Sequence, residues 1–216
     1  MTKKALIVQG GWDGHQPKEV SELLGGQLRE NGFEVTISDT LDAFKEHDLT
    51  QLDLIVPIWT MGKIEKEQLL PVLEAVKGGV GLAGVHGGMC DAFRNETEWQ
   101  YMTGGQWVAH PGNDGVEYTV EMNPAEPSPI TDGIPTLHIK SEQYYMHVDP
   151  AIRVLATTTF ADGTVMPVAW TKMWGKGRVF YCSLGHQANV LEAPEVLELV
   201  TRGMLWAAEQ EVAEPA

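Results

Sequence analysis

Four histidines of this chain stand where imidazole side chains could reach one common site. Three of them follow short apolar runs that are typical of buried strands, and the fourth lies in a loop. They are His15 after Ala5–Val8, His86 after Val80–Val85, His186 after Val179–Leu184, and His110 within Trp107-Val108-Ala109-His110-Pro111. In an open parallel sheet the carboxyl ends of the strands share one edge, where ligand sites form. We therefore expect these imidazoles to converge, where they could bind a metal ion or transfer protons.

The string Gly84-Val85-His86-Gly87-Gly88 predicts a sharp turn between a strand and a helix, with His86 at its apex. Glycines suit such an elbow because its central residue is strained and has close backbone neighbours. In hydrolases and amidotransferases the side chain presented there is Ser or Cys, whereas here it is an imidazole. Cys90 lies about one helical turn further on, which places it away from the apex. A histidine that only caps a helix would produce the same string.

Two glycine-rich segments contain a tryptophan. Gly10–His15 has neither the spacing of a dinucleotide fingerprint nor that of a phosphate-binding loop, so we exclude both kinds of site. Trp107 follows Gly104-Gly105-Gln106 in an expected loop, and its indole face could form a pocket wall on which a sugar stacks. The alternative for Trp107 is a buried side chain that anchors the loop.

Glu142 and His147 follow a strand-like run in the second half of the chain. On an extended segment, residues five apart project to opposite faces, so the two side chains need a bend between them to share one site. Glu142 is the better candidate for a metal ligand or general base, and His147 comes second. A solvated carboxylate on a strand edge is the alternative for Glu142.

Imidazole and carboxylate ligands without paired thiols suit Zn, Mn, Fe or Ni better than Ca or Mg. The two cysteines, Cys90 and Cys182, form no CxxC pair, so a thiolate zinc site is not expected. His47 and His138 are not placed at strand ends, and we expect them to be surface or structural residues. The candidate ligands of a divalent transition metal, with zinc as the first expectation, are His15, His86, His110, His186 and Glu142.

Strands and helices alternate in the first half of the chain, which predicts a parallel sheet with right-handed crossovers. The elements expected there are strands at Ala5–Val8, Phe33–Ser38, Leu52–Ile58 and Val80–Val85, with helices that begin at Pro17 and over Lys63–Lys77. Pro71 interrupts the second helical pattern, so that helix starts late or kinks. The later elements are a short helix at Glu96–Met102, strands at Val116–Glu121, Thr136–Tyr145 and Arg153–Phe160, a hairpin of Val165–Trp174 with Arg178–Ser183, and a helix at Pro194–Ala208.

Length and composition fit a single domain over residues 1–210, followed by a polar tail at 211–216 that we expect to be frayed. With 15 basic and 30 acidic residues, the formal charge of −15 disfavours nucleic acid and anionic membranes as partners. No apolar run approaches the ~18 residues of a membrane span, and the N-terminal apolar run is too short for a signal peptide. The expected location is a reducing cytoplasm.

These motifs, in their order along the chain, resemble the ThuA-like family of trehalose-utilisation proteins from Ala5 to about Ala208. The resemblance is carried by Gly-Gly-Trp-Asp-Gly-His15, Gly-Val-His86-Gly-Gly, Gly104-Gly105 with His110-Pro111, Ser141-Glu142-Gln143-Tyr144-Tyr145, and Gly175-Lys176-Gly177-Arg178 leading to Leu184-Gly185-His186. It implies an α/β three-layer sandwich of the flavodoxin-like or class I glutamine amidotransferase-like kind. The sheet would be mostly parallel, with an antiparallel hairpin.

The resemblance also implies kinship to amidotransferases whose elbow holds a cysteine and whose distal histidine, which His186 resembles, completes a triad. His86 replaces that thiol here, so glutamine amidotransferase chemistry is excluded. Members of the family are associated with the catabolism of disaccharides and keto-sugars. The partner expected from this resemblance is therefore a small-molecule sugar, and oligomers are common in the fold family, so we expect a homo-oligomer.

The leading hypothesis is a metal-dependent hydrolase or isomerase that acts on a sugar derivative. In this hypothesis His86, His186 and Glu142 carry the chemistry, and the pocket is lined by Trp12, Trp107, Tyr144 and His147. One competing hypothesis is a non-catalytic sugar-binding or assembly protein on the same scaffold. The other is a hydrolase that uses Cys90, which requires an exposed thiol beside a base.

Overall fold

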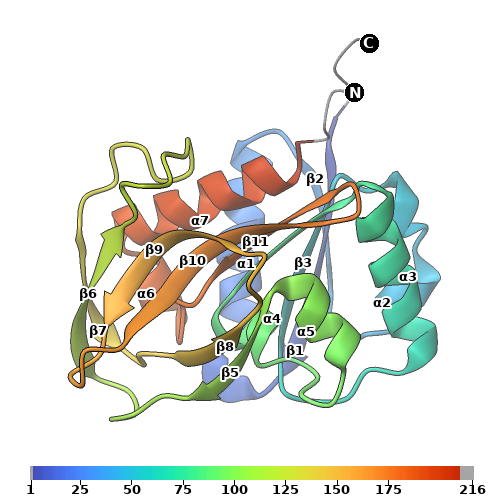
Figure 1. Ribbon diagram of the computed structural model, residues 1–216. Helices are drawn as coiled ribbons and strands as arrows, with labels where there is room; N and C mark the ends of the chain where they lie inside the picture. The colour runs from blue at the N-terminus through green and yellow to red at the C-terminus, as the bar shows by residue number, and fades with distance from the viewer. Residues whose placement is uncertain (1, 210–216) are drawn as a thin grey trace.

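The computed structural model of the chain describes residues 2–209 and shows helices on both faces of a central sheet (Figure 1). The strands in chain order are β1 (Lys4–Gly11), β2 (Glu34–Ser38), β3 (Leu54–Thr60), β4 (Gly81–Val85), β5 (Gly105–Ala109), β6 (Val116–Met122), β7 (Leu137–Ser141), β8 (Tyr145–Val148), β9 (Arg153–Thr159), β10 (Val165–Trp174) and β11 (Gly177–Cys182). The helices are α1 (Pro17–Glu30), α2 (Ala43–Glu46), α3 (Lys66–Gly78), α4 (His86–Cys90), α5 (Thr97–Thr103), α6 (Ala188–Leu191) and α7 (Pro194–Ala207), with 3-10 turns at Asp13–His15 and Leu49–Gln51.

The parallel part of the sheet confirms the prediction from strand and helix alternation. Within residues 2–209 the main sheet has the order β2-β1-β3-β4-β11-β10-β9-β6-β7, and its first five strands run parallel. Their carboxyl ends therefore share one edge, as expected for a flavodoxin-like α/β sandwich. The predicted hairpin is β10 with β11, and the sheet continues beyond it through antiparallel strands.

Two predictions for the second half of the chain are wrong in detail. The expected strand Thr136–Tyr145 is two strands in different sheets, because β7 ends at Ser141 and β8 begins at Tyr145. The expected loop around Trp107 is strand β5, which pairs with β8. The two changes have one cause, since the chain leaves the sheet edge after Ser141 and returns to form a separate ribbon with β5.

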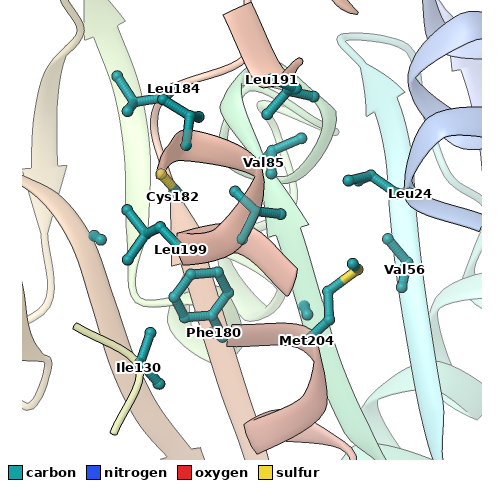
Figure 2. Packing of buried hydrophobic residues seen from close by; sticks show 14 of the residues in the cluster. Leu24, Val56, Val85, Ile130, Phe180, Cys182, Leu184, Leu191, Leu199 and Met204 are labelled. Carbon is teal, nitrogen blue, oxygen red and sulfur yellow. The ribbon is translucent and has the colours of Figure 1, made fainter. Parts of the chain in front are cut away.

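Apolar side chains fill the space between the sheet and the helices on each face. One core cluster joins α1, α6 and α7 to the sheet, and Figure 2 shows Leu24, Val56, Phe180 and Met204 among its members. Helix α7 lies very close to the sheet, because a Cβ at Gly203 would stand 2.2 Å from the Phe180 ring. The second cluster joins α2, α3, α4 and α5 to the opposite face.

Helix α3 contains Pro71 and starts late, as the interrupted helical pattern predicts. It begins at Lys66, three residues after the predicted start, and a capping box formed by Glu65 and Gln68 satisfies backbone groups of its first turn. Pro71 lies inside the helix. The proline leaves one carbonyl of the first turn without its helical donor, which is tolerable close to a helix start.

Among the described helices, none is both long and apolar enough to cross a membrane. The tail predicted at 211–216 lies outside the described residues. The assignment of residues 1–210 to one domain stays a prediction.

Candidate functional site

Four side chains from distant parts of the chain meet at the carboxyl edge of the parallel strands. Each offers one ligand atom, and these atoms all lie within 4.8 Å of one another. All four residues are buried, with relative exposures of 2 to 8%. The members of this His–Glu cluster are His15, His86, Glu142 and His186.

The elbow predicted at His86 is present, with β4 passing directly into α4. His86 has a φ of +48°, in the left-handed region that is unfavourable for residues other than glycine. The Tyr181 hydroxyl donates to the His86 carbonyl at 2.9 Å and holds the turn. A Cβ at Gly87 would lie 2.7 Å from the His15 ring, so only glycine lets the two histidines approach.

Backbone and hydroxyl partners orient two of the imidazoles. His86 Nδ1 lies 2.7 Å from the carbonyl oxygen of Ser183, and since a carbonyl only accepts, this nitrogen carries the proton. His15 Nδ1 lies 2.8 Å from Oγ1 of Thr60, at the end of β3. Partners of this kind fix the ring orientation of metal-binding histidines.

The remaining nitrogens point at one carboxylate oxygen. In the neutral ring His86 Nε2 has a lone pair, and it lies 3.1 Å from Oε2 of Glu142. His186 Nδ1 lies 3.2 Å from the same oxygen without hydrogen-bond geometry, and within residues 2–209 it has no other partner. His15 Nε2 is 4.0 Å away from it. The lone pair of His86 and the carboxylate of Glu142 therefore face each other in a buried space, beside ring nitrogens of His15 and His186, an arrangement that a cation would satisfy.

The pKa values favour the ligand forms of His15, His86 and Glu142, and the protonated form of His186. The pKa of His15 is lowered to about 3, mainly by burial and then by the neighbouring imidazoles, and burial also lowers the pKa of His86. Burial alone would raise the pKa of Glu142, but the close imidazole of His186, which can carry a proton, outweighs it and holds this pKa well below its usual range. The same carboxylate raises the pKa of His186. Near neutral pH, Glu142 is therefore ionised while His15 and His86 are neutral.

His110 lies beside the cluster and not in it. Its Nε2 is 3.7 Å from Oε1 of Glu142, the oxygen that the other three histidines do not face. Its side chain is 29% exposed, and it lies outside the four residues whose ligand atoms meet. The sequence predicts His110 as a further ligand, whereas the structure has it at the open side of the cluster.

A cavity of about 190 Å³ opens onto the cluster. This is smaller than the pockets that hold drug-sized ligands, and it suits a small molecule or one sugar ring. Its lining comprises Trp12, His15, Met61, Asp91, Arg94, Trp107, His110, Glu142 and Tyr144. Tyr144 stacks on the His86 ring with 3.9 Å between centroids, and Trp12 stands edge-on to His15 at 4.7 Å.

Other candidates lie away from this cavity. His147 is exposed on β8, opposite Gln106. The sequence predicts it in the pocket wall, but it does not line the cavity. His47 and His138 are exposed, in line with a surface role. The hypothesis of a nucleophilic Cys90 is wrong, because its thiol is buried and burial raises its pKa far above the usual value.

Sequence reasoning did not find four residues of the site, which are Thr60, Ser183, Asp91 and Arg94. Thr60 lies two residues beyond the predicted strand Leu52–Ile58, so the strand-end argument applied to the histidines could have found it. Ser183 acts through its backbone carbonyl, for which no sequence pattern exists. Asp91 and Arg94 have the i, i+3 spacing of an ion pair, but nothing in that spacing shows that they face a cavity.

The model of the ThuA family, described as trehalose utilisation, matches residues 4–207. No curated protein sequence matches the chain. Among solved structures, a ThuA-like protein from Parabacteroides merdae has a TM-score of 0.81 at 19% identity, over 100% of this chain and 93% of that one. A ThuA-like protein from Bacteroides uniformis has a TM-score of 0.76 at 16% identity, over 95% and 91% of the two chains.

The fold also recurs inside a larger protein. A β-galactosidase from Rahnella sp. R3 has a TM-score of 0.66 at 13% identity, over 97% of this chain but only 32% of its own. At these identities the likeness to solved structures shows the fold alone. The match to the family model, over residues 4–207, is the finding that shows the family.

Proposed function

Because the chain belongs to the ThuA family, whose description is trehalose utilisation, we propose that it is a metal-dependent enzyme that hydrolyses or isomerises a small sugar or sugar derivative. The observation that carries this proposal is the buried His–Glu cluster. In it the proton of His86 is committed to Ser183, so its free lone pair faces the carboxylate of Glu142 at 3.1 Å. A cation between such groups turns mutual repulsion into attraction.

The donor set fits a divalent transition metal, and zinc is our first expectation, with Mn, Fe and Ni as alternatives. The ligand atoms of the four residues all lie within 4.8 Å of one another, so they could hold one ion between them. The cavity on one side leaves room for a further ligand, which a catalytic site needs.

The proposed chemistry divides between the metal and the protein. A bound metal would polarise a sugar carbonyl or lower the pKa of a water molecule to about 7. His15, His86, His186 and Glu142 would hold it, which makes His86, His186 and Glu142 the residues on which activity depends most. His110 would hold or release a proton at the open side, where its Nε2 lies 3.7 Å from Glu142.

The aromatic walls would bind the sugar. Trp12 is 46% exposed at the mouth of the cavity, and its indole can take the apolar face of a ring. Tyr144 is buried flat against His86, so it would limit how far a ring enters. Trp107 forms a further wall.

The test combines metal content with turnover in a double variant, His86→Ala with His186→Ala. We expect the purified protein to contain one transition metal per chain by elemental analysis, and the double variant to lose both the metal and the turnover of disaccharides and their keto forms. The matched control removes two exposed histidines, His47→Ala with His138→Ala, and should keep both. Full metal content and full turnover in the first variant would refute the proposal.

We further propose a cytoplasmic homo-oligomer. The two cysteines are free and buried, which fits a reducing compartment. Sedimentation of the purified chain tests the oligomer, and a monomer at micromolar concentration would contradict it.

A further inference from the structure

An ion pair that the proposed chemistry does not use lines the same cavity. Nε of Arg94 donates to Oδ1 of Asp91 at 2.6 Å, and Nη2 donates to Oδ2 at 2.9 Å. The guanidinium also lies over the Trp107 ring, 4.7 Å from its centre. Bidentate pairing and stacking together fix the orientation of the guanidinium plane, although 45% of the Arg94 side chain is exposed.

Strained backbone supports this ion pair. Met61, which follows β3, and Phe93 have φ values of +59° and +48°, which are unfavourable for side chains of their size. Met61 N–H donates to the Asp91 carbonyl at 2.8 Å, and Phe93 N–H donates to the Met61 carbonyl at 3.1 Å. Residues are held in such conformations mostly at ligand sites and switches, where the surrounding structure imposes them.

The charge of the pair decides which ligand suits it. Both oxygens of Asp91 are engaged by Arg94, and the Asp91 side chain is only 5% exposed. Within residues 2–209, Nη1 of Arg94 forms no hydrogen bond, so its donors are free. A guanidinium whose charge is already balanced offers hydrogen bonds without strong attraction for an anion, which favours hydroxyl oxygens over a carboxylate or phosphate.

We propose that the Asp91–Arg94 pair, held against Trp107, is a sugar-binding subsite that recognises hydroxyl oxygens of an uncharged sugar ring beside the His–Glu cluster. This inference rests on the proposed function, because it deepens the substrate class of that site. Arg94 would donate to the ring hydroxyls, and Asp91 would suppress binding of anionic sugars.

The first test measures binding by titration calorimetry with two probes, methyl glucoside and glucuronate, on the zinc-loaded protein. We expect the uncharged glucoside to bind the wild type, and Arg94→Gln to weaken this binding by about tenfold or more. Arg153→Gln is the matched control, because Arg153 pairs with Glu126 at 2.6 Å on the surface and away from the cavity. It should bind like the wild type.

The second test shifts the preference of the subsite from an uncharged sugar toward an anionic one. Asp91→Asn leaves the charge of Arg94 unbalanced, so the affinity for glucuronate relative to the glucoside should rise by about tenfold. Comparing this ratio between variant and wild type cancels the contribution of the metal. Because thermal melting is recorded for every variant, an unfolded Arg94→Gln leaves the Asp91→Asn ratio as the deciding measurement.

Three results would overturn the subsite: unchanged glucoside affinity in a folded Arg94→Gln, an unchanged ratio in Asp91→Asn, or absence of glucoside binding to the wild type. Metal content is measured in the same samples. If the wild type holds no metal but Arg94-dependent glucoside binding persists, the proposed function fails while the subsite stands. If the metal is bound and Arg94 has no effect, the opposite holds.

Discussion

Two buried polar groups in this molecule are built in opposite ways. Lys172, on β10, has a side chain only 4% exposed, yet its ammonium donates to Asp149 at 2.8 Å and to the Tyr101 carbonyl. It also lies over the Tyr101 ring, 4.3 Å from its centre. In the His–Glu cluster, by contrast, the Nε2 lone pair of neutral His86 faces a carboxylate oxygen, and Nδ1 of His186 lies near the same oxygen without hydrogen-bond geometry.

The difference separates a structural role from a functional one. A buried charge whose donors and acceptors are matched is satisfied by the folded chain and needs no ligand. Removing one member of such a pair leaves the other buried and unpaired. Electron-pair donors that face one another have no such match. They lower the free energy of unfolding of the metal-free protein, and a bound cation would remove this loss. Four changes test this contrast, from the largest expected effect to the smallest.

Glu142→Gln should weaken or abolish the stabilisation of the protein by metal. Zinc at a free concentration 1,000 times its dissociation constant should stabilise the wild type by about 4 kcal/mol, whereas the variant should need about 100-fold more metal or show no gain. Without metal the variant should be at least as stable as the wild type, because an amide can donate to Nε2 of His86. Denaturant unfolding with and without zinc measures both.

The control for that change is Glu117→Gln, which alters an exposed carboxylate that pairs with Lys140 at 3.2 Å. It should respond to zinc like the wild type. Equal zinc stabilisation of Glu142→Gln would show that the cluster is a structural network like the one around Lys172.

Lys172→Met should act in the opposite sense. It should lower the free energy of unfolding by about 3 kcal/mol, because Asp149 loses its partner in a partly buried place, and metal content should stay the same. The matched change Lys140→Met removes one side of an exposed pair and should cost less than about 1 kcal/mol. Chemical denaturation compares the two; similar losses would contradict the assignment.

Thr60→Val should weaken metal binding without unfolding the protein. It removes the hydroxyl that lies 2.8 Å from Nδ1 of His15 while keeping the side-chain shape. Loss of a partner that orients a ligand costs about tenfold to a hundredfold in metal affinity. Competition with a zinc chelator measures the change, and Thr171→Val, at a buried threonine of β10, should leave the affinity unaltered.

The smallest effect concerns acid stability. Burial alone would raise the pKa of Asp149, but hydrogen bonds from Lys172 and the Ala151 N–H hold it below its usual value of 3.8. Since the folded pKa is the lower one, this stabilisation is present above pH 3.8 and disappears as the pH falls through the folded pKa. In Asp149→Asn the loss of stability below pH 3.8 should therefore be shallower than in the wild type. Unfolding curves at several acidic pH values, without metal, test this; parallel curves would argue against it.

The part of the site that could be predicted from the sequence is the part that parallel strands deliver. His86 and His186 follow apolar runs, and once those runs are parallel strands their carboxyl ends share an edge whatever the details of packing. The position of His15 could be predicted for the same reason, because it comes after the strand Ala5–Val8. His110, predicted as a further ligand, lies beside the cluster and not among its four ligand residues, because a loop position predicts proximity and not coordination.

Glu142 shows where such an argument stops. It follows β7, the edge strand at the far end of the antiparallel part, yet it lies 3.1 Å from His86 at the end of β4. Only the return of the chain after Ser141, to pair as β8 with β5, brings the carboxylate back to the histidines. Sequence periodicity predicted one unbroken strand there, because alternation of side chains cannot show which sheet a strand joins.

By itself the sequence determined the parallel half, the elbow at His86 and the class of ligand atoms, since these depend on local pattern and on the common direction of strands. Tertiary structure decided that Glu142 faces the imidazoles, that Ser183 and Thr60 orient two of them, and that Asp91 and Arg94 line the cavity. Those contacts join residues far apart in the chain through backbone groups and strand pairing, which no local spacing encodes.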